Sequence, residues 1–491
     1  MKEPRDASLI DSLIPIVSLV SMLSVSVYLF ESDSSYGPNQ IALILSAGIA
    51  TIVAIKNGYL WNDILDAIVQ SIGTAMGALL IFLCVGALIG SWLLSGTVPT
   101  LIYYGLELLN PTIFYPAACV ICAIAALATG SSWTVAGTLG VALIAVSIGL
   151  NLSPAIAAGA IISGAYFGDK MSPLSDTTNL APAVTGTDLF THIRHMVWTT
   201  APSFVVALII FMFLGLGVSN EAEDATIKLF NQTLQEAFNI TPITLIPLVL
   251  VFYMAIKKVP ALPTILTGAL SGALVAFFFQ TEVVLVFSNS DELPFILSMV
   301  KGIWIALASG YVSVTGVTEI DSLLSRGGME SMLNTMWLVI SAMSFGAVLE
   351  YSGMLQRIIS STLKAAKTTG SLISRIILSC ISINIVCADQ YISIVLAGKM
   401  FKAEFANRDL DPKNLSRVIE DSGTLTSPLV PWNTCGAYMS ATLGVATFAY
   451  LPFAFFNLIN PMVSMIYGYT CLLYTSPSPR DAHESRMPSS A

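Results

Sequence analysis

The stretch from Gly168 to Asn179 holds the residues whose types and spacing are best suited to chemistry. It combines two carboxylates, one ammonium group, four hydroxyls and one amide, and its glycine and proline oppose a continuous helix. The segments on either side are almost entirely apolar. Polar, irregular backbone at membrane depth is tolerated only where it lines a cavity or is buried in protein, and ionisable side chains there usually mark a transport path. We therefore interpret the stretch as part of an ion or substrate site; a polar loop between two spans is the alternative.

The composition is that of an all-α, polytopic membrane protein. Hydrophobic residues make up 55% of the 491 residues and charged residues 10%, whereas a soluble domain carries roughly 25% charged residues. A transmembrane helix needs about 20 apolar residues, so we expect about 11–14 apolar segments in the lipid bilayer, some of them broken or re-entrant. Residues 471–491 are abruptly polar, and we expect a disordered tail there, for which a non-native junction is one explanation.

Several functional classes are excluded by what the sequence lacks. The net charge is −9 and no basic patch with interleaved aromatic residues occurs, so no nucleic-acid partner is expected. No phosphate-cradling glycine motif occurs, so no nucleotide is expected, and uphill transport must be driven by an ion gradient. His192 and His195 lie at a predicted membrane edge and His483 in the tail, so the serines of the apolar core have no histidine partner. We expect neither an enzyme nor a cofactor, and a homo-oligomer stays open.

Two halves of the chain share a pattern. Short matches recur in the same order with a nearly constant offset of about 257 residues, and they pair Leu94-Ser95-Gly96 with Tyr351-Ser352-Gly353, and Ser172-Pro173-Leu174 with Ser427-Pro428-Leu429. The placement of lysine and arginine favours opposite orientations of the two halves, as in many secondary transporters. We predict one integral domain over residues 1–470, with repeat one at about 11–217, a linking span at 240–257 and repeat two at about 261–468. Residues 73–95 and 416–440 are each predicted to form one span.

Glycine pairs in the predicted span 73–95 indicate close helix packing. Gly73 and Gly77, and likewise Gly86 and Gly90, are four residues apart and therefore lie on one face of a helix. Small residues at this spacing let two backbones approach each other. We expect a structural role for them.

The polar stretches of both halves supply the oxygen ligands that a hard cation such as sodium prefers. They cover residues 129–134 with 168–179 in the first half, and 387–391 with 420–434 in the second. Burial favours the protonated form of a carboxylate, and a nearby cation favours its ionised form. A carboxylate balanced between these effects binds either a proton or a sodium ion, and this competition is sufficient for exchange. The candidate ligands and proton carriers are Asp169, Asp176, Asp389, Asp421, Ser172, Thr177, Thr178, Asn179, Thr129, Ser131, Ser132, Ser427, Asn433 and Thr434.

Three further residues are accessory candidates. Lys170 could pair with Asp169 and hold it ionised, and Glu420 precedes Asp421 in the second polar stretch. Glu350 lies deep in an apolar run, where it could relay protons or simply lie at the membrane interface. Each aspartate, taken singly, could instead belong to a buried ion pair or a helix cap.

We expect the protein to exchange sodium ions for protons. The alternative is sodium- or proton-coupled exchange of small carboxylates such as malate and lactate. The alternative requires cations or N–H donors in the pocket. Arg194, Arg375 and Arg417 are expected at the ends of spans rather than inside them. This placement favours ions over organic anions.

Residues 168–181, from Gly168-Asp169-Lys170-Met171 through Asn179-Leu180-Ala181, closely resemble the signature of the NhaC-type sodium/proton antiporters. Residues 129–134 resemble its companion motif, and 389–391 with 427–434 resemble the pair in the second half. The resemblance covers roughly residues 10–470. It implies the ion transporter superfamily fold, with two inverted repeats and broken or re-entrant helices, in the cytoplasmic membrane of a bacterium or archaeon. It also implies sodium/proton exchange by alternating access, and the family includes exchangers of small carboxylates.

Overall fold

The computed structural model describes residues 4–30, 34, 36–216, 224–290, 292–363, 368–470 and 472. Within these ranges the chain is almost entirely helical, and the one pairing of extended backbone is an isolated bridge between Tyr311 and Arg326. The all-α class expected from composition is therefore confirmed. The predicted tail, residues 471–491, lies outside the described residues except for Leu472.

The described ranges contain nine helices that are long and apolar enough to cross a membrane, or up to 11 if each of two bent helix pairs forms one span. One pair joins α11 (Asp224–Ala237) to α12 (Ile246–Ile256) with a 90° bend, and the other joins α23 (Thr447–Tyr450) to α24 (Phe455–Thr470) with a 56° bend. The chain is thus a multi-pass membrane protein with broken helices, as its composition predicts. The inverted relation of the two halves and their boundaries stay predictions.

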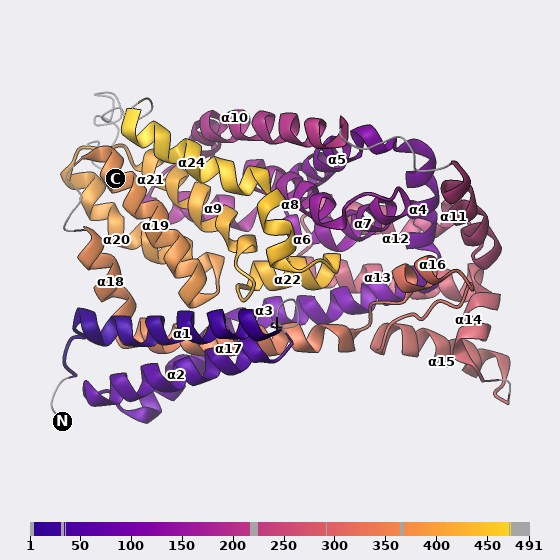
Figure 1. Ribbon diagram of the computed structural model, residues 1–491, viewed down its shortest axis with the longest axis horizontal. Coiled ribbons are helices and arrows are strands. Elements are labelled where there is room, and N and C mark those ends of the chain that lie inside the picture. The colour runs from indigo at the N-terminus through magenta and orange to yellow at the C-terminus, as the bar shows by residue number, and fades with distance from the viewer. Residues whose placement is uncertain are drawn as a thin grey trace, which may run out of the picture.

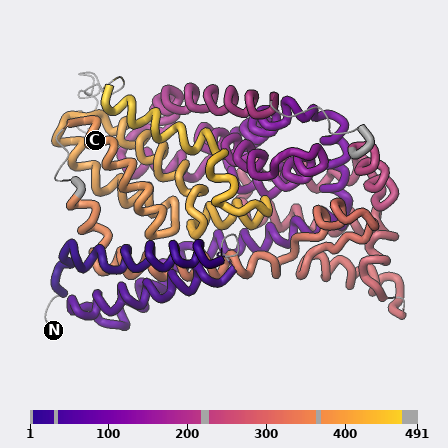
Figure 2. The backbone as a smooth tube through the Cα atoms, in the orientation of Figure 1, coloured from indigo at the N-terminus to yellow at the C-terminus, as the bar shows by residue number. Residues whose placement is uncertain are grey.

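The helices form two layers (Figures 1 and 2). In the first layer α17 packs against α2 and α3, and α13 and α15 also pack against α3. This layer contains α1 (Leu9–Phe30), α2 (Pro38–Lys56), α3 (Trp61–Leu94), α13 (Ala261–Phe279), α14 (Thr281–Ser288), α15 (Phe295–Ala308) and α17 (Leu333–Tyr351).

The second layer carries all the polar motifs. In it α5 packs against α8, α24 packs against α10 and α19, and α9 packs against α20. It contains α5 (Phe114–Thr129), α6 (Ser132–Val135), α7 (Val141–Gly149), α8 (Pro154–Met171), α9 (Asp176–Thr185), α10 (Leu189–Leu216), α19 (Thr369–Cys387), α20 (Gln390–Asn407), α21 (Pro412–Ile419), α22 (Thr434–Leu443) and α24. The shorter helices α4 (Thr97–Leu108), α16 (Thr318–Leu324) and α18 (Met354–Leu363) connect these elements.

Two predicted spans differ from the structure. Residues 73–95 are the second part of α3, a 34-residue helix that begins at Trp61. Residues 416–440 are not one helix, because α21 continues into a π-helical turn (Glu420–Thr424) and a 3-10 turn (Ser427–Leu429) before α22 begins. Pro428 and Pro431 have no backbone N–H to donate, so a regular helix cannot continue through this segment. Hydropathy alone predicts one continuous span over residues 416–440 and does not indicate this break.

Gly86 and Gly90 lie where α3 makes its closest backbone contacts. A methyl group on Gly86 would meet the carbonyl oxygen of Gly328, and one on Gly90 would meet the carbonyl oxygen of Ala306. The Gly328 N–H also donates a hydrogen bond of 2.7 Å to the Gly86 carbonyl. Close packing is thus confirmed for this glycine pair. Gly73 and Gly77 are exposed and would meet nothing within 4 Å among the described residues, so close packing at this second pair stays a prediction.

We expect Gly90→Ala to destabilise the protein by about 1–3 kcal/mol, because overpacking at a backbone contact forces two elements apart. Gly77→Ala is the matched control on the same helix, since its methyl group would lie in open space. Thermal unfolding of both purified variants in detergent measures the difference. Equal melting temperatures would show that the contact between α3 and α15 does not limit stability.

Candidate ion-binding site

The helix breaks that open the first polar motif of each half have the same local geometry. α5 ends at Gly130 in the left-handed conformation (φ 69°), and the Ser131 side chain then caps α6 by accepting a hydrogen bond of 3.2 Å from the N–H three residues later. α19 ends at Ala388, also left-handed (φ 56°), and the Asp389 side chain caps α20 by accepting one of 3.0 Å. The left-handed conformation is costly for alanine. The same break thus occurs at positions 130 and 388, which are 258 residues apart.

A second pair of breaks follows the same spacing. After α8 ends, Ser175 caps α9 by accepting a hydrogen bond of 3.4 Å from the Thr178 N–H. After the 3-10 turn that follows α21, Asn433 caps α22 by accepting one of 3.0 Å from the Cys435 N–H. Positions 175 and 433 are again 258 residues apart. Both halves therefore present two helix N-termini directly beside their polar motifs.

Asp169 joins the two polar stretches of the first half. Its Oδ2 atom accepts hydrogen bonds from the hydroxyl of Ser132 at 2.7 Å and from the Ser132 N–H at 3.2 Å. The Thr178 hydroxyl lies within 3.0 Å of the Lys170 carbonyl and 3.3 Å of the Asp169 carbonyl. The Asp169 carboxylate is buried, so the N-terminus of α6 and one hydroxyl replace much of the water it loses.

In the second half, side-chain amide groups link the polar segments to one another through hydrogen bonds. The side-chain N–H₂ of Asn384 donates hydrogen bonds to the Gly423 carbonyl at 2.7 Å and to the Thr426 hydroxyl at 2.9 Å. Asn433 donates to the Asn384 carbonyl at 3.1 Å, and Ser427 donates to the side-chain oxygen of Gln390 at 3.2 Å. Asn384 and Gln390 are absent from the predicted ligands. A lone asparagine inside the apolar run 370–387 is the signal that could have identified Asn384.

The two halves meet at Tyr391, in the first turn of α20. Its phenol lies close enough to Asp169, Asp176 and Asp389 to interact electrostatically with all three. Asp169 and Asp389 are buried, whereas Asp176 is exposed and the Tyr391 side chain is 42% exposed. Acids of both halves thus lie in the neighbourhood of Tyr391, and two of these side chains, Asp176 and Tyr391, are exposed.

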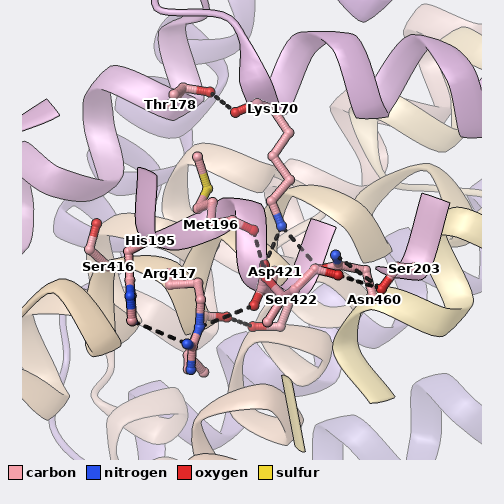
Figure 3. Close-up of polar contacts among 12 residues, drawn as sticks. Lys170, Thr178, His195, Met196, Ser203, Ser416, Arg417, Asp421, Ser422 and Asn460 are labelled. Atoms are coloured by element: carbon pink, nitrogen blue, oxygen red, sulfur yellow. Dashed lines mark hydrogen bonds and ion pairs between the residues drawn. The ribbon is translucent and has the colours of Figure 1, made fainter. Parts of the chain in front are cut away.

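The fourth aspartate, Asp421, belongs to a separate buried ion cluster (Figure 3). Its carboxylate forms an ion pair with Lys170, whose ammonium group also donates to Asn460 at 3.0 Å. Thr199 donates to Asp421 at 3.1 Å, and the Arg417 guanidinium lies 3.6 Å from the other carboxylate oxygen. All of these side chains are fully buried. Lys170 therefore pairs with Asp421 from the other half of the chain, and not with the neighbouring Asp169.

Three residues predicted at membrane edges are buried instead. Arg417 and His192 have no exposed surface, and His195 is 9% exposed. The Nε2 atom of His195 lies 2.9 Å from Asn414 and 3.1 Å from the Arg417 guanidinium, and His192 contacts the Ser416 hydroxyl at 2.5 Å. These groups come from α10 and α21, whose polar faces pack against each other. Polarity at the end of an apolar run therefore did not mean exposure here.

The two glutamates differ in their surroundings. Glu420 is fully buried in the π-helical turn, and neither carboxylate oxygen has a hydrogen-bond partner among the described residues. A buried carboxylate without partners is costly unless it is neutral or holds a cation, and π-helical turns are frequent at functional sites. Glu350, on α17, is partly exposed and lies close enough to Asp389 to interact electrostatically with it.

Of the remaining candidate ligands, some form local hydrogen bonds and others lie on the exposed surface. The Thr129 hydroxyl donates to the Ala125 carbonyl, and the Ser172 hydroxyl accepts from the Leu174 N–H. The other hydroxyl candidates contact their own cap residues: Thr177 contacts Ser175, and Thr434 contacts Asn433. The Asn179 amide donates to the Pro173 and Ser175 carbonyls on an exposed surface. Among the described residues, no three His, Cys, Asp or Glu side chains are grouped as a metal site, so a sodium ion would need hydroxyl, amide or carbonyl oxygens as well.

Ser132→Ala is expected to raise the sodium concentration for half-maximal exchange about tenfold at fixed pH. A hydrogen bond to a charged group contributes about 1.5–3 kcal/mol, and the lost hydroxyl stabilises the ionised form of Asp169 that would hold sodium. Sodium titration of exchange in proteoliposomes measures this shift. Ser382→Ala, an exposed serine on α19, is the matched control; if both variants need the same sodium concentration as the unaltered protein, Ser132 does not support the ion site.

A multi-pass helical protein with broken helices in both halves, and with buried ionisable groups between them, has the architecture of a secondary active transporter. The model of the Na+/H+ antiporter family matches residues 164–472. The chain belongs to this family, which confirms the resemblance of its motifs to the NhaC type.

Three relatives extend the comparison over nearly the whole chain. The Na(+)/H(+) antiporter NhaC of Alkalihalophilus pseudofirmus is 39% identical over 85% of this chain and 88% of its own length. An uncharacterized Na(+)/H(+) antiporter of Haemophilus influenzae is 39% identical over 94% and 96%. The malate-2H(+)/Na(+)-lactate antiporter of Bacillus subtilis is 38% identical over 96% of both chains.

Proposed function

We propose that this chain exchanges sodium ions for protons across the cell membrane, and that both ions compete for the carboxylates gathered around Tyr391. One observation carries the assignment of the site. Asp169 and Asp389 come from different halves of the chain, lie beside helix breaks and are buried. Buried ionisable side chains within a membrane protein usually mark an ion or proton pathway.

The chemistry follows from the neighbours of each acid. When Asp169 is ionised, the Ser132 hydroxyl and N–H stabilise its charge, and a sodium ion completes the neutralisation. When sodium leaves, the buried charge is costly, so a proton takes its place. Asp421 is already neutralised by Lys170, so we assign it to the support of the site rather than to the ions that move. Alternation of the pocket between the two sides of the membrane then gives obligatory exchange.

Proteoliposomes containing the purified protein and an internal pH dye test the proposal. Sodium chloride added outside should drive protons out of the vesicles, whereas choline chloride should not. Liposomes without protein control for leaks, and Asp169→Asn controls for the site. If sodium moves no protons with protein of verified folding, sodium/proton exchange is rejected.

A second candidate is sodium- or proton-coupled exchange of small carboxylates. It is favoured by the similarity to a relative named for malate and lactate exchange. The buried Arg417 does not by itself serve such a substrate, because it faces Asp421. Uptake of radiolabelled malate or lactate into the same proteoliposomes separates the two functions.

A further inference from the structure

Three aromatic rings from three different parts of the fold stack on one another beside the first polar motif. Trp133, in the first turn of α6, and Tyr438, on α22, are nearly parallel, with ring centroids 4.2 Å apart and an angle of 8° between the planes. The ring of Phe82, on α3, lies 5.7 Å from that of Trp133 and 5.6 Å from that of Tyr438. Phe82 and Tyr438 are buried. The stack therefore connects the first helix layer with elements of both halves of the chain.

Tyr438 also contacts the backbone of the turn that contains Trp133. Its hydroxyl donates a hydrogen bond of 2.8 Å to the Trp133 carbonyl. A methyl group on Gly137, in the π-helical turn that follows α6 (Ala136–Gly140), would lie 2.8 Å from the same hydroxyl. Glycine at this position thus leaves the space that the tyrosine occupies. The ring and the hydroxyl together hold the first turn of α6 from the other half of the chain.

The same turn holds Asp169. Trp133 directly follows Ser132, whose N–H and hydroxyl both donate to the Asp169 carboxylate. The N–H groups of the first turn of a helix have no partners within the helix, so their direction depends on how the turn is held. Hydrogen bonds weaken steeply when their angle departs from linearity. A small rotation of the turn would therefore weaken the hydrogen bonds that stabilise the ionised carboxylate.

α22 connects this contact to the second polar motif. At the N-terminus of α22, Asn433 donates a hydrogen bond of 3.1 Å to the Asn384 carbonyl in α19, and Tyr438 follows little more than one helical turn later. α22 also packs against α3 and α17 of the first layer (Figure 1). A displacement of α22 relative to α6 would thus reach Asp169 through the ring and hydroxyl of Tyr438.

We propose that Tyr438 is a positioning residue of the ion site, which sets the affinity of Asp169 for sodium by holding the Ser132 turn from the opposite half. The inference rests on the proposed exchange of sodium for protons and adds a connection between the two halves to it. Tyr438 acts through the N–H and hydroxyl of Ser132 and not as a ligand of the ion. A tyrosine with a merely structural role would stabilise the protein and leave its sodium affinity unchanged.

Binding of radiolabelled sodium to the purified full-length protein in detergent tests this role. Tyr438→Phe keeps the ring and loses the hydroxyl, so it should weaken sodium binding about threefold or more, in the range expected for one hydrogen bond. Tyr115→Phe is the matched control, because Tyr115 is also fully buried and its hydroxyl accepts one backbone hydrogen bond, of 3.1 Å, from the Ser153 N–H. Melting temperatures of both variants report the structural cost. Unchanged sodium binding by Tyr438→Phe, or the same weakening in Tyr115→Phe, would overturn the role.

The double variant Ser132→Ala/Tyr438→Phe tests whether Tyr438 acts through the Ser132 turn. Residues that act through one contact have effects that do not combine independently. The loss of sodium affinity in the double variant should therefore be clearly smaller than the product of the two single losses, and a full product would overturn the proposed route. Sodium-driven proton movement is measured separately. Sodium binding without proton movement rejects the exchange alone, whereas absence of sodium binding by the unaltered protein rejects both proposals.

Discussion

Asp169→Asn is expected to abolish sodium-driven proton movement, to below about 1% of the unaltered rate, while the protein still inserts and folds. Asparagine keeps the volume of the side chain and an oxygen that can accept the Ser132 hydrogen bonds. It cannot take up a proton or carry the charge that holds a sodium ion. The loss should therefore be in transport and not in structure. Exchange in proteoliposomes is measured beside the melting temperature in detergent.

Asp389→Asn should behave in the same way for a related reason. Asp389 caps α20 through its side chain, and asparagine caps a helix about as well as aspartate does. The variant thus separates the charge from the cap. Asp66→Asn, at an exposed position of α3, is the matched control and should keep full exchange. Full exchange by both Asp169→Asn and Asp389→Asn would remove the carboxylates at Tyr391 from the transport path.

The helix breaks could be predicted from the sequence because their causes are local. Gly130, Pro173 and the capping side chains act within a few residues, so irregular segments at 129–134 and 172–175 follow from residue types alone. Residues 416–440 differ, because hydropathy predicts one span there whereas Pro428 and Pro431 prevent a regular helix. In these segments, glycine, proline and capping residues therefore predict helix breaks better than hydropathy does.

The partners of the charged groups could not be predicted, because they come from distant parts of the chain. Lys170 could be assigned only to its neighbour Asp169, whereas the fold brings it to Asp421, 251 residues away. Arg417 and the histidines of α10 are buried because two helix ends pack against each other, which no pattern within either helix reveals. Burial at the end of a span is a property of tertiary packing.

The ion cluster leads to the second prediction, which concerns stability. Asp421→Asn leaves two buried cations, Lys170 and Arg417, without the carboxylate between them. Removal of one partner from a buried ion pair costs about 3–5 kcal/mol, because the other charge stays in a medium of low dielectric constant. We expect a loss of this size, measured as a large fall in melting temperature in detergent. Lys170→Met should cost less, because Asp421 then keeps Arg417 and the Thr199 hydroxyl.

The order of these two effects distinguishes a supporting cluster from a transport site. If Asp421 supports the structure, Asp421→Asn should have a lower melting temperature than Lys170→Met. The half-exposed ion pair of Arg408 and Glu404 is the control for loss of a carboxylate at the surface. Glu404→Gln should cost at most about 0.5 kcal/mol, as is typical of such i,i+4 pairs. If Asp421→Asn instead melts like the unaltered protein and loses only exchange, Asp421 carries the ions. In that case Lys170 would be the group that sodium displaces from its carboxylate, and the charges of both clusters would take part in transport.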